Sequence, residues 1–278
     1  MVRVAILDMN NNVPNLGLGN IVEIVKDFSD EVESQVFDVR YKGELPDTTW
    51  DIYISSGGPG DPLEGDGDWD KRYYGLMDAL WQHNVSNSNK KYAFFICHSF
   101  QMMVHHLKIA DIVPRQSMSF GTFPAHKTAK GEKETFFQSL PDPFYVADFR
   151  HWQVLNPNVE RLEETGAKII ALEKIRPHVD LERAIMAIRF SEEFFGTQFH
   201  PEANPVGMLK HFREPDKYHL VLEKFDQEKY QTMIDDIHNP QKMSLTHDEV
   251  IPTFMKDAIR KITKQKKLKT VEIQELTV

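Results

Sequence analysis

Residues 92–107 read YAFFICHSFQMMVHHL and join two hydrophobic patterns with no loop between them. The first part, Tyr92–Cys97, is a short apolar run of the kind found in the buried strands of parallel sheets. The second part, Phe100–Leu107, has helical spacing. This stretch therefore predicts a strand that turns directly into a helix, with Cys97 at the turn.

The chain up to about residue 205 continues this alternation of short β-branched or aromatic runs with helical patterns. We expect further strands at Val2–Leu7, Val36–Val39, Trp50–Ser55, Ala184–Phe190 and Phe194–Phe199, and helices at Ile21–Phe28 and Trp69–His83. Such an alternation predicts an α/β fold, a mostly parallel sheet flanked by helices. The acidic link Ser191–Glu193 predicts a hairpin between the last two strands.

The pattern changes after residue 205, where strand signals stop and long helical patterns begin. The clearest are Lys217–Ile237 and Asp248–Ile262, the second interrupted or started by Pro252. The excess of acidic residues also ends here, since residues 205–278 are nearly balanced in charge. We therefore expect an α/β domain over residues 1–205 and a helical C-terminal extension over residues 206–278.

The composition is that of an ordinary globular protein, with 41% hydrophobic and 27% charged residues. No apolar run is long enough to span a bilayer, and the N-terminus resembles a buried strand rather than an export signal. The net charge of −9 argues against a general nucleic-acid binder, which needs a clustered basic surface. We expect a cytoplasmic protein with no nucleic-acid or membrane partner.

Cys97 is the single cysteine of the chain, so the thiol is either inert core or a nucleophile, and an internal disulfide is excluded. The start of a helix stabilises a thiolate through unpaired N–H groups and the positive end of the helix dipole. A side chain between a strand and a helix also projects above the carboxyl edge of the sheet. These features predict a nucleophilic Cys97, with the N–H of His98 as an oxyanion donor.

A second oxyanion donor is available in the turn Ser56-Gly57-Gly58-Pro59-Gly60, which follows an expected strand. Glycine-rich turns at strand ends expose N–H groups that can hold a developing negative charge. Gly58 is the better candidate, because Pro59 has no N–H.

The third component is a base at the end of the strand Phe194–Phe199. His200 follows that strand directly, and Glu202 can orient and charge-balance the imidazole once Pro201 bends the chain. Cysteine, histidine and glutamate together predict attack on an amide carbon, with the histidine moving the proton to the leaving amine.

These segments resemble, in order along the chain, the three signatures of class I glutamine amidotransferases. The matching segments are Ser56-Gly57-Gly58-Pro59-Gly60, Ile96-Cys97-x-x-x-Gln101 and Gly196-Thr197-Gln198-Phe199-His200-Pro201-Glu202. The resemblance spans roughly residues 1–205, and the glutaminase domain of GMP synthase is one relative that it is similar to.

The resemblance implies a glutaminase, in which Cys97 forms a γ-glutamyl thioester, ammonia leaves and water releases glutamate. By the same comparison Gln101 would contact the substrate, and the segment around Phe120 and Gly121 would hold the amino-acid end of glutamine. Gly57 and Gly60 would belong to the substrate-binding turn.

Two residues depart from the family pattern, since Phe95 and Ser99 stand where the elbow usually has glycines. We expect a crowded elbow, with Phe95 affecting substrate shape or efficiency. This departure motivates an alternative of the same fold, a stand-alone γ-glutamyl amide hydrolase. A non-enzymatic module that binds or regulates a partner is a third possibility, against which the intact Cys97, His200 and Glu202 argue.

The sequence shows no P-loop pattern, so we expect the ammonia-accepting chemistry on a separate synthase polypeptide, with the helical extension as a docking surface. His98, His105 and His106 could share one helical face, but no carboxylate or cysteine set completes a metal site. We expect structural or solvated histidines there, and neither a metal nor a cofactor.

Overall fold

The computed structural model describes residues 1–65, 67–177 and 182–276, with side chains described up to residue 268. Its strands are Val2–Asp8 (β1), Val32–Asp38 (β2), Ile52–Ser55 (β3), Tyr92–Ile96 (β4), Asp111–Lys127 (β5), Phe144–Leu155 (β6), Lys168–Glu173 (β7), Ile185–Arg189 (β8) and Phe194–Thr197 (β9). Its α-helices are Leu16–Lys26 (α1), Trp69–Ser86 (α2), His98–His106 (α3), Val159–Thr165 (α4), Pro205–Phe212 (α5), Pro215–Lys224 (α6), Gln227–His238 (α7) and Leu245–Leu276 (α8).

Within the described ranges the strands form one sheet in the order β2-β1-β3-β4-β9-β8-β7-β5-β6. The first five are parallel to one another, and from β9 onward each further strand is antiparallel to the one before it. The α/β class is thus confirmed. Since β4 lies between β3 and β9, the carboxyl ends of these three strands meet at one edge of the sheet.

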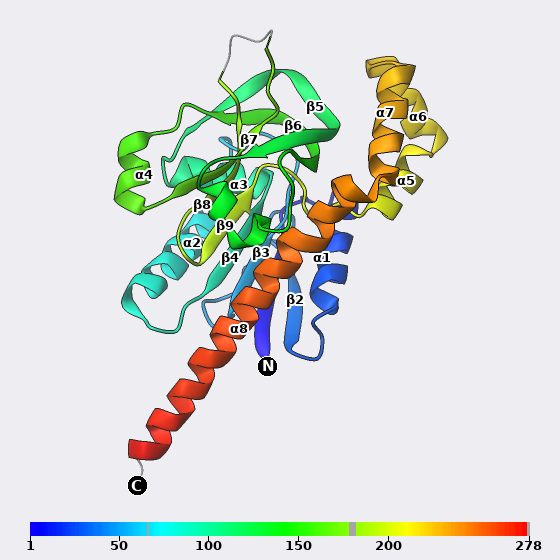
Figure 1. Ribbon diagram of the computed structural model, residues 1–278. Coiled ribbons are helices and arrows are strands. Elements are labelled where there is room, and N and C mark those ends of the chain that lie inside the picture. The colour runs from blue at the N-terminus through cyan, green and yellow to red at the C-terminus, as the bar shows by residue number, and fades with distance from the viewer. Residues whose placement is uncertain (66, 178–181, 277–278) are drawn as a thin grey trace.

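Helices cover both faces of the parallel strands (Figure 1). Alternate strand residues face opposite sides, as the pleat requires. Phe94 and Ile96 of β4 belong to the core shared with α1 and α8, whereas Phe95 belongs to the core shared with α2 and α3.

The C-terminal helices divide into two groups. Helices α5 to α7 pack against the β5–β6 hairpin through a separate apolar cluster that includes Phe120, Phe149 and Phe212. We call α5 and α6 the cap. Helix α8 instead lies across the sheet, and Phe254 and Met255 are buried in its core (Figure 1). The boundary at residue 205 remains a prediction, although α8 shares the main core.

Two predicted helices differ from those observed. The expected helix Lys217–Ile237 is broken at Phe225, where φ is −135° and ψ is −129°, and Asp226 caps the next helix. Helix α8 begins at Leu245 and continues through Pro252. Pro252 lies inside the helix, where proline removes one backbone hydrogen bond, and the apolar face buried against the sheet offsets that loss.

Candidate active site

Cys97 lies between β4 and α3, where the sequence predicts the turn. Its φ of 48° and ψ of −98° are unusual for a residue with a side chain. The backbone is held there on both sides, since Cys97 N–H donates to Thr197 O at 2.8 Å and Gln101 N–H donates to Cys97 O at 2.9 Å. The strand pairing and the first turn of α3 therefore hold the nucleophile in a strained conformation.

Ser99 connects this elbow to the neighbouring strand β3 by hydrogen bonds. Its Oγ accepts a hydrogen bond from Ile96 N–H at 2.9 Å and lies 2.9 Å from Ser55 O, which it can donate to. Ser99 is fully buried. A glycine at this position would have no side chain to bridge the ends of β3 and β4.

Phe95 points away from the catalytic edge. Its ring packs edge to face with Phe190 and Phe194, at centroid distances of 6.0 and 5.8 Å. Gly196 lies opposite it on β9, and a Cβ there would be 3.2 Å from the Cβ of Phe95. The large ring therefore fills the core on the α2–α3 side, and Phe95 does not line the cavity beside Cys97.

His200 and Glu202 come together as the sequence predicts. His200 Nδ1 lies 2.7 Å from Glu202 Oε1, and His200 N–H donates to Ala147 O of β6 at 2.9 Å. With Nδ1–H donating to the carboxylate, Nε2 is the nitrogen left for the thiol of Cys97.

Burial alone disfavours the charged form of His200, but the attraction of Glu202 and of Cys97 outweighs it and raises the pKa of His200 well above its usual value. A protonated imidazole between a carboxylate and a sulfur favours an imidazolium–thiolate pair. The surroundings of His200 therefore favour its protonated form.

The N-terminus of α1 approaches the Glu202 carboxylate. A Cβ built on Gly17 would lie 2.8 Å from Glu202 Oε1, so glycine is needed for this close contact. Glu202 is 1% exposed. The imidazole and the positive end of α1 both balance its buried charge.

The glycine-rich turn lies beside the same groups. A Cβ on Gly57 would lie 2.9 Å from His200 Cε1, and one on Gly58 would lie 2.2 Å from Met9 O. Arg40 holds the outer part of the turn by donating to Pro59 O at 2.6 Å. Gly60 has a φ of 98° and lies near that guanidinium, in a conformation that glycine adopts readily.

His98 begins α3, so its N–H has no acceptor within the helix. Its side chain is 3% exposed. Burial and then the charge of Arg40 lower the pKa of His98 to about 3, so the imidazole is neutral near pH 7. The backbone of His98, not its ring, is the group suited to meet an oxyanion.

A cavity of about 450 Å³ opens over these residues. Residues from loops, strands and the cap contribute to it: Asn10, Val13, Pro14, Asn15, Leu16, Gly17, Asn20, Gly58, Pro59, Cys97, Met118, Phe120, Phe149, His200, Glu202, Ala203, Met208, His211, Phe212 and Lys217. The β1–α1 loop contributes asparagines to this lining, and the other segments contribute aromatic and methionine side chains.

Only some of the candidate substrate-binding residues line this cavity. Phe120 lines it, whereas Gly121 lies behind it, where a Cβ would be 3.0 Å from Met233. Gln101 is buried, does not line the cavity, and donates from Nε2 to Gln198 Oε1 at 3.0 Å.

Several residues of the cavity were not expected from the sequence. The cap supplies Met208, Phe212 and Lys217, and the β1–α1 loop supplies Asn10 and Asn15. The run of asparagines between residues 10 and 20, directly after the first strand, was the available signal, because loops at that edge border the site.

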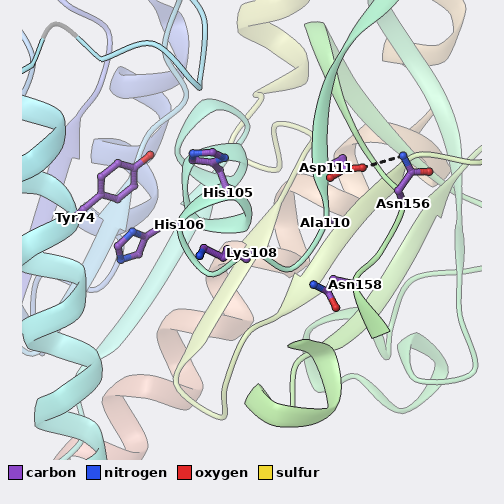
Figure 2. A pocket seen from close by; sticks show the side chains of 8 residues that line it. All are labelled: Tyr74, His105, His106, Lys108, Ala110, Asp111, Asn156 and Asn158. Carbon is purple, nitrogen blue, oxygen red and sulfur yellow. Dashed lines mark hydrogen bonds between the residues drawn. The ribbon is translucent and has the colours of Figure 1, made fainter. Parts of the chain in front are cut away.

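A second cavity of about 450 Å³ lies at the other end of α3 (Figure 2). His106 stacks on Tyr74 at 4.5 Å, and its Nε2 lies 2.6 Å from Asp78 Oδ1. Asn156 Nδ2 donates to Asp111 Oδ2 at 3.0 Å. His98 at one end of the helix is therefore separated from His105 and His106 at the other.

Comparison with known proteins agrees with this geometry. The sequence model of the family "Glutamine amidotransferase class-I" matches residues 19–212, more than half of the chain. A search of curated proteins finds no match. Among the described residues no helix is both long and apolar enough to cross a membrane.

Three solved structures share the fold at low sequence identity. A glutamine amidotransferase from Thermotoga maritima is 16% identical, with a TM-score of 0.66 and coverage of 93% of this chain and 98% of its own. A protein assigned to GMP synthase, from Thermoplasma acidophilum, is 17% identical, with a TM-score of 0.51 and coverage of 73% and 85%. The glutaminase domain of Trypanosoma brucei CTPS, with bound acivicin, is 14% identical, with a TM-score of 0.54 and coverage of 73% and 86%.

The extent of the family match decides the assignment, because it includes the elbow, the glycine-rich turn and the His200–Glu202 pair in one continuous segment. The chain belongs to the class-I glutamine amidotransferase family.

Proposed function

We propose that this protein is a glutaminase that uses Cys97, His200 and Glu202 as a catalytic triad. The observation that carries the proposal is the strained Cys97 elbow beside a partly buried histidine whose Nδ1 lies 2.7 Å from Glu202 Oε1. Membership of the family supports amide chemistry on glutamine in general. The triad and its roles are our assignment.

The reaction begins with attack of the Cys97 thiolate on the γ-carboxamide carbon of glutamine. The N–H groups of His98 and Gly58 stabilise the oxyanion that forms. As the C–N bond breaks, the His200 imidazolium gives its proton to the departing nitrogen, and ammonia leaves.

The γ-glutamyl thioester is then hydrolysed. Neutral His200 takes a proton from water, the hydroxide attacks the thioester carbon, and the C–S bond breaks to release glutamate and the thiolate. Glu202 keeps the imidazole oriented through both steps.

A second substrate class is favoured by the apolar wall of the cavity. Met118, Phe149, Met208 and Phe212 offer a surface for the amine part of a γ-glutamyl amide, a group that glutamine lacks. Under this alternative water accepts the acyl group and no synthase is needed.

The two functions are separated by measuring glutamate release from glutamine and from γ-glutamyl amides with methyl, butyl and benzyl substituents. A glutaminase is expected to have the highest kcat/KM for glutamine. Turnover of the substituted amides alone would reject the first proposal. If neither class is hydrolysed and a glutamine-analogue electrophile does not label Cys97, with or without cell extract, the chain is a binding module.

Ammonia from the reaction would pass to a synthase in trans. Two structural neighbours carry the names of GMP synthase and of the glutaminase domain of CTPS, which supports a synthase as the class of partner. Pull-down with the full chain and identification of a co-purifying synthase tests this assignment. Stimulation of glutamine hydrolysis by that protein is the expected result.

A further inference from the structure

Two buried glutamines connect α3, β9 and the nucleophile. Gln198 follows β9 and is fully buried, and Gln101 in the first turns of α3 is 3% exposed. Gln198 Nε2 donates to Cys97 Sγ at 3.7 Å, and Gln198 Oε1 accepts from Gln101 Nε2 at 3.0 Å. A chain of two hydrogen bonds therefore runs from Gln101 through Gln198 to the sulfur.

The direction of this chain matters because an amide has a donor edge and an acceptor edge. With its oxygen taken by Gln101, Gln198 presents its NH2 group to Cys97. A hydrogen bond to a thiolate is charge-assisted and stronger than one to a neutral thiol. Gln198 thus favours the charged form of the nucleophile.

The ionisable groups that surround the sulfur or line its cavity come from four segments, one of which is the cap, with His211 and Lys217. His200, paired with Glu202, faces it from the segment after β9. His98 on α3 is neutral, and Arg40 from the segment after β2 contacts the glycine-rich turn. Gln198 adds a donor whose charge does not change with pH.

We infer that Gln198 and Gln101 form a positioning relay for Cys97, in which Gln198 donates to the thiolate and Gln101 fixes the orientation of Gln198. Gln101 then acts on Cys97 through Gln198. The effect of this relay on glutamine hydrolysis rests on the proposed function. Its effect on the reactivity of the Cys97 thiol does not.

The relay is tested by alkylation with iodoacetamide across pH 5–9, followed by intact mass. Cys97 is the single cysteine of the chain, so the label reports on it alone. Gln198→Met is expected to shift the midpoint of the alkylation profile to higher pH and to slow labelling at pH 6 by about 3- to 10-fold. Gln101→Met should cause a smaller shift in the same direction.

The double variant distinguishes a relay from two separate structural effects. If Gln101 acts only through Gln198, the double variant should match Gln198→Met and not the product of the two single effects. Gln231→Met, which replaces an exposed glutamine on α7, is the control and should leave the profile unchanged.

If Gln198→Met does not fold, Gln198→Glu is the second variant, because glutamate has nearly the same volume as glutamine. It places a carboxylate beside the sulfur, so the midpoint should rise further. An unchanged alkylation profile in a folded Gln198 variant overturns the relay. A shifted profile in a protein that hydrolyses no glutamine would overturn only the proposed function.

Discussion

The cavities at the two ends of α3 are similar in size, about 450 Å³ each, but their linings differ. At the start of the helix, buried groups from separate strands converge on Cys97, whose backbone is strained. At its end, the partly exposed His106 pairs with Asp78 of α2 and stacks on Tyr74, which Figure 2 shows beside it. Convergence of ionisable groups, and not volume, is the reason for proposing the Cys97 end as the catalytic one.

Replacing the nucleophile is the strongest test of this difference. Cys97→Ala should lower glutamine hydrolysis by about 10³-fold or more, because no other thiol can form the acyl intermediate. His106→Ala, at the other end of α3, should change the rate by less than about twofold. Glutamate release is measured for both, and comparable losses would remove the distinction between the two cavities.

Glu202→Gln should have the next largest effect. The variant keeps the shape of the side chain but removes the charge that stabilises the imidazolium of His200. We expect kcat to fall by roughly 10- to 100-fold. The alkaline limb of the pH–rate profile, where His200 loses its proton, should move to lower pH, because the attraction that raises the pKa of His200 is gone. A pH–rate profile checks both effects, and an unchanged kcat contradicts the role of Glu202.

Two glycines of α1 provide a matched pair for the next test. A Cβ on Gly17 would lie 2.8 Å from Glu202 Oε1 and 2.8 Å from Oδ1 of the N-cap Asn15, whereas a Cβ on Gly19 would have no neighbour within 4 Å. Gly17→Ala should lower kcat by about tenfold through displacement of Glu202. Gly19→Ala should keep full activity and stabilise the helix by up to about 1 kcal/mol. Equal activity of the two variants would show that the contact with α1 is not needed.

The sequence was most informative where local patterns and fixed motifs coincide. The apolar run Tyr92–Cys97 predicted β4 and the elbow to within one residue. His200 and Glu202 were placed together because only one residue, Pro201, separates them along the chain. The elbow and the His200–Glu202 pair are each formed by residues close together in the sequence. Their meeting follows from the rule that parallel strands have their carboxyl ends at one edge of the sheet.

The β5–β6 hairpin and the cap could not be predicted in the same way. Strand β5 contains Pro114, Pro124 and a shift in register, so its pattern is not that of a regular strand. The contact of Lys217 with the cavity depends on how helices far along the chain fold back over Cys97. Phe95 was expected to crowd the elbow, but the pleat of β4 turns its ring into the core between the sheet and helices α2 and α3.

The smallest expected effect concerns the histidine at each end of α3. The folded protein keeps His98 neutral with a pKa of about 3, below the value near 6.5 of an unfolded chain. The unfolded state therefore binds the extra proton, and the stability that depends on neutral His98 is complete above about pH 6.5 and is lost as the pH falls toward 3. Relative to His98→Gln, the wild type should lose about 1 kcal/mol of unfolding free energy between pH 6.5 and 5.5.

Urea unfolding of both proteins at pH 7.5, 6.5 and 5.5 measures this difference. His105→Gln, at the exposed end of α3, shows what the loss of a surface histidine does by itself. Because the oxyanion donor that we propose is the backbone N–H of His98 and not its ring, His98→Gln should retain turnover at pH 7.5 within a few-fold. If the difference in unfolding free energy between the wild type and His98→Gln does not change with pH, the ring of His98 must reach solvent. The start of α3 would then be less buried than the structure shows.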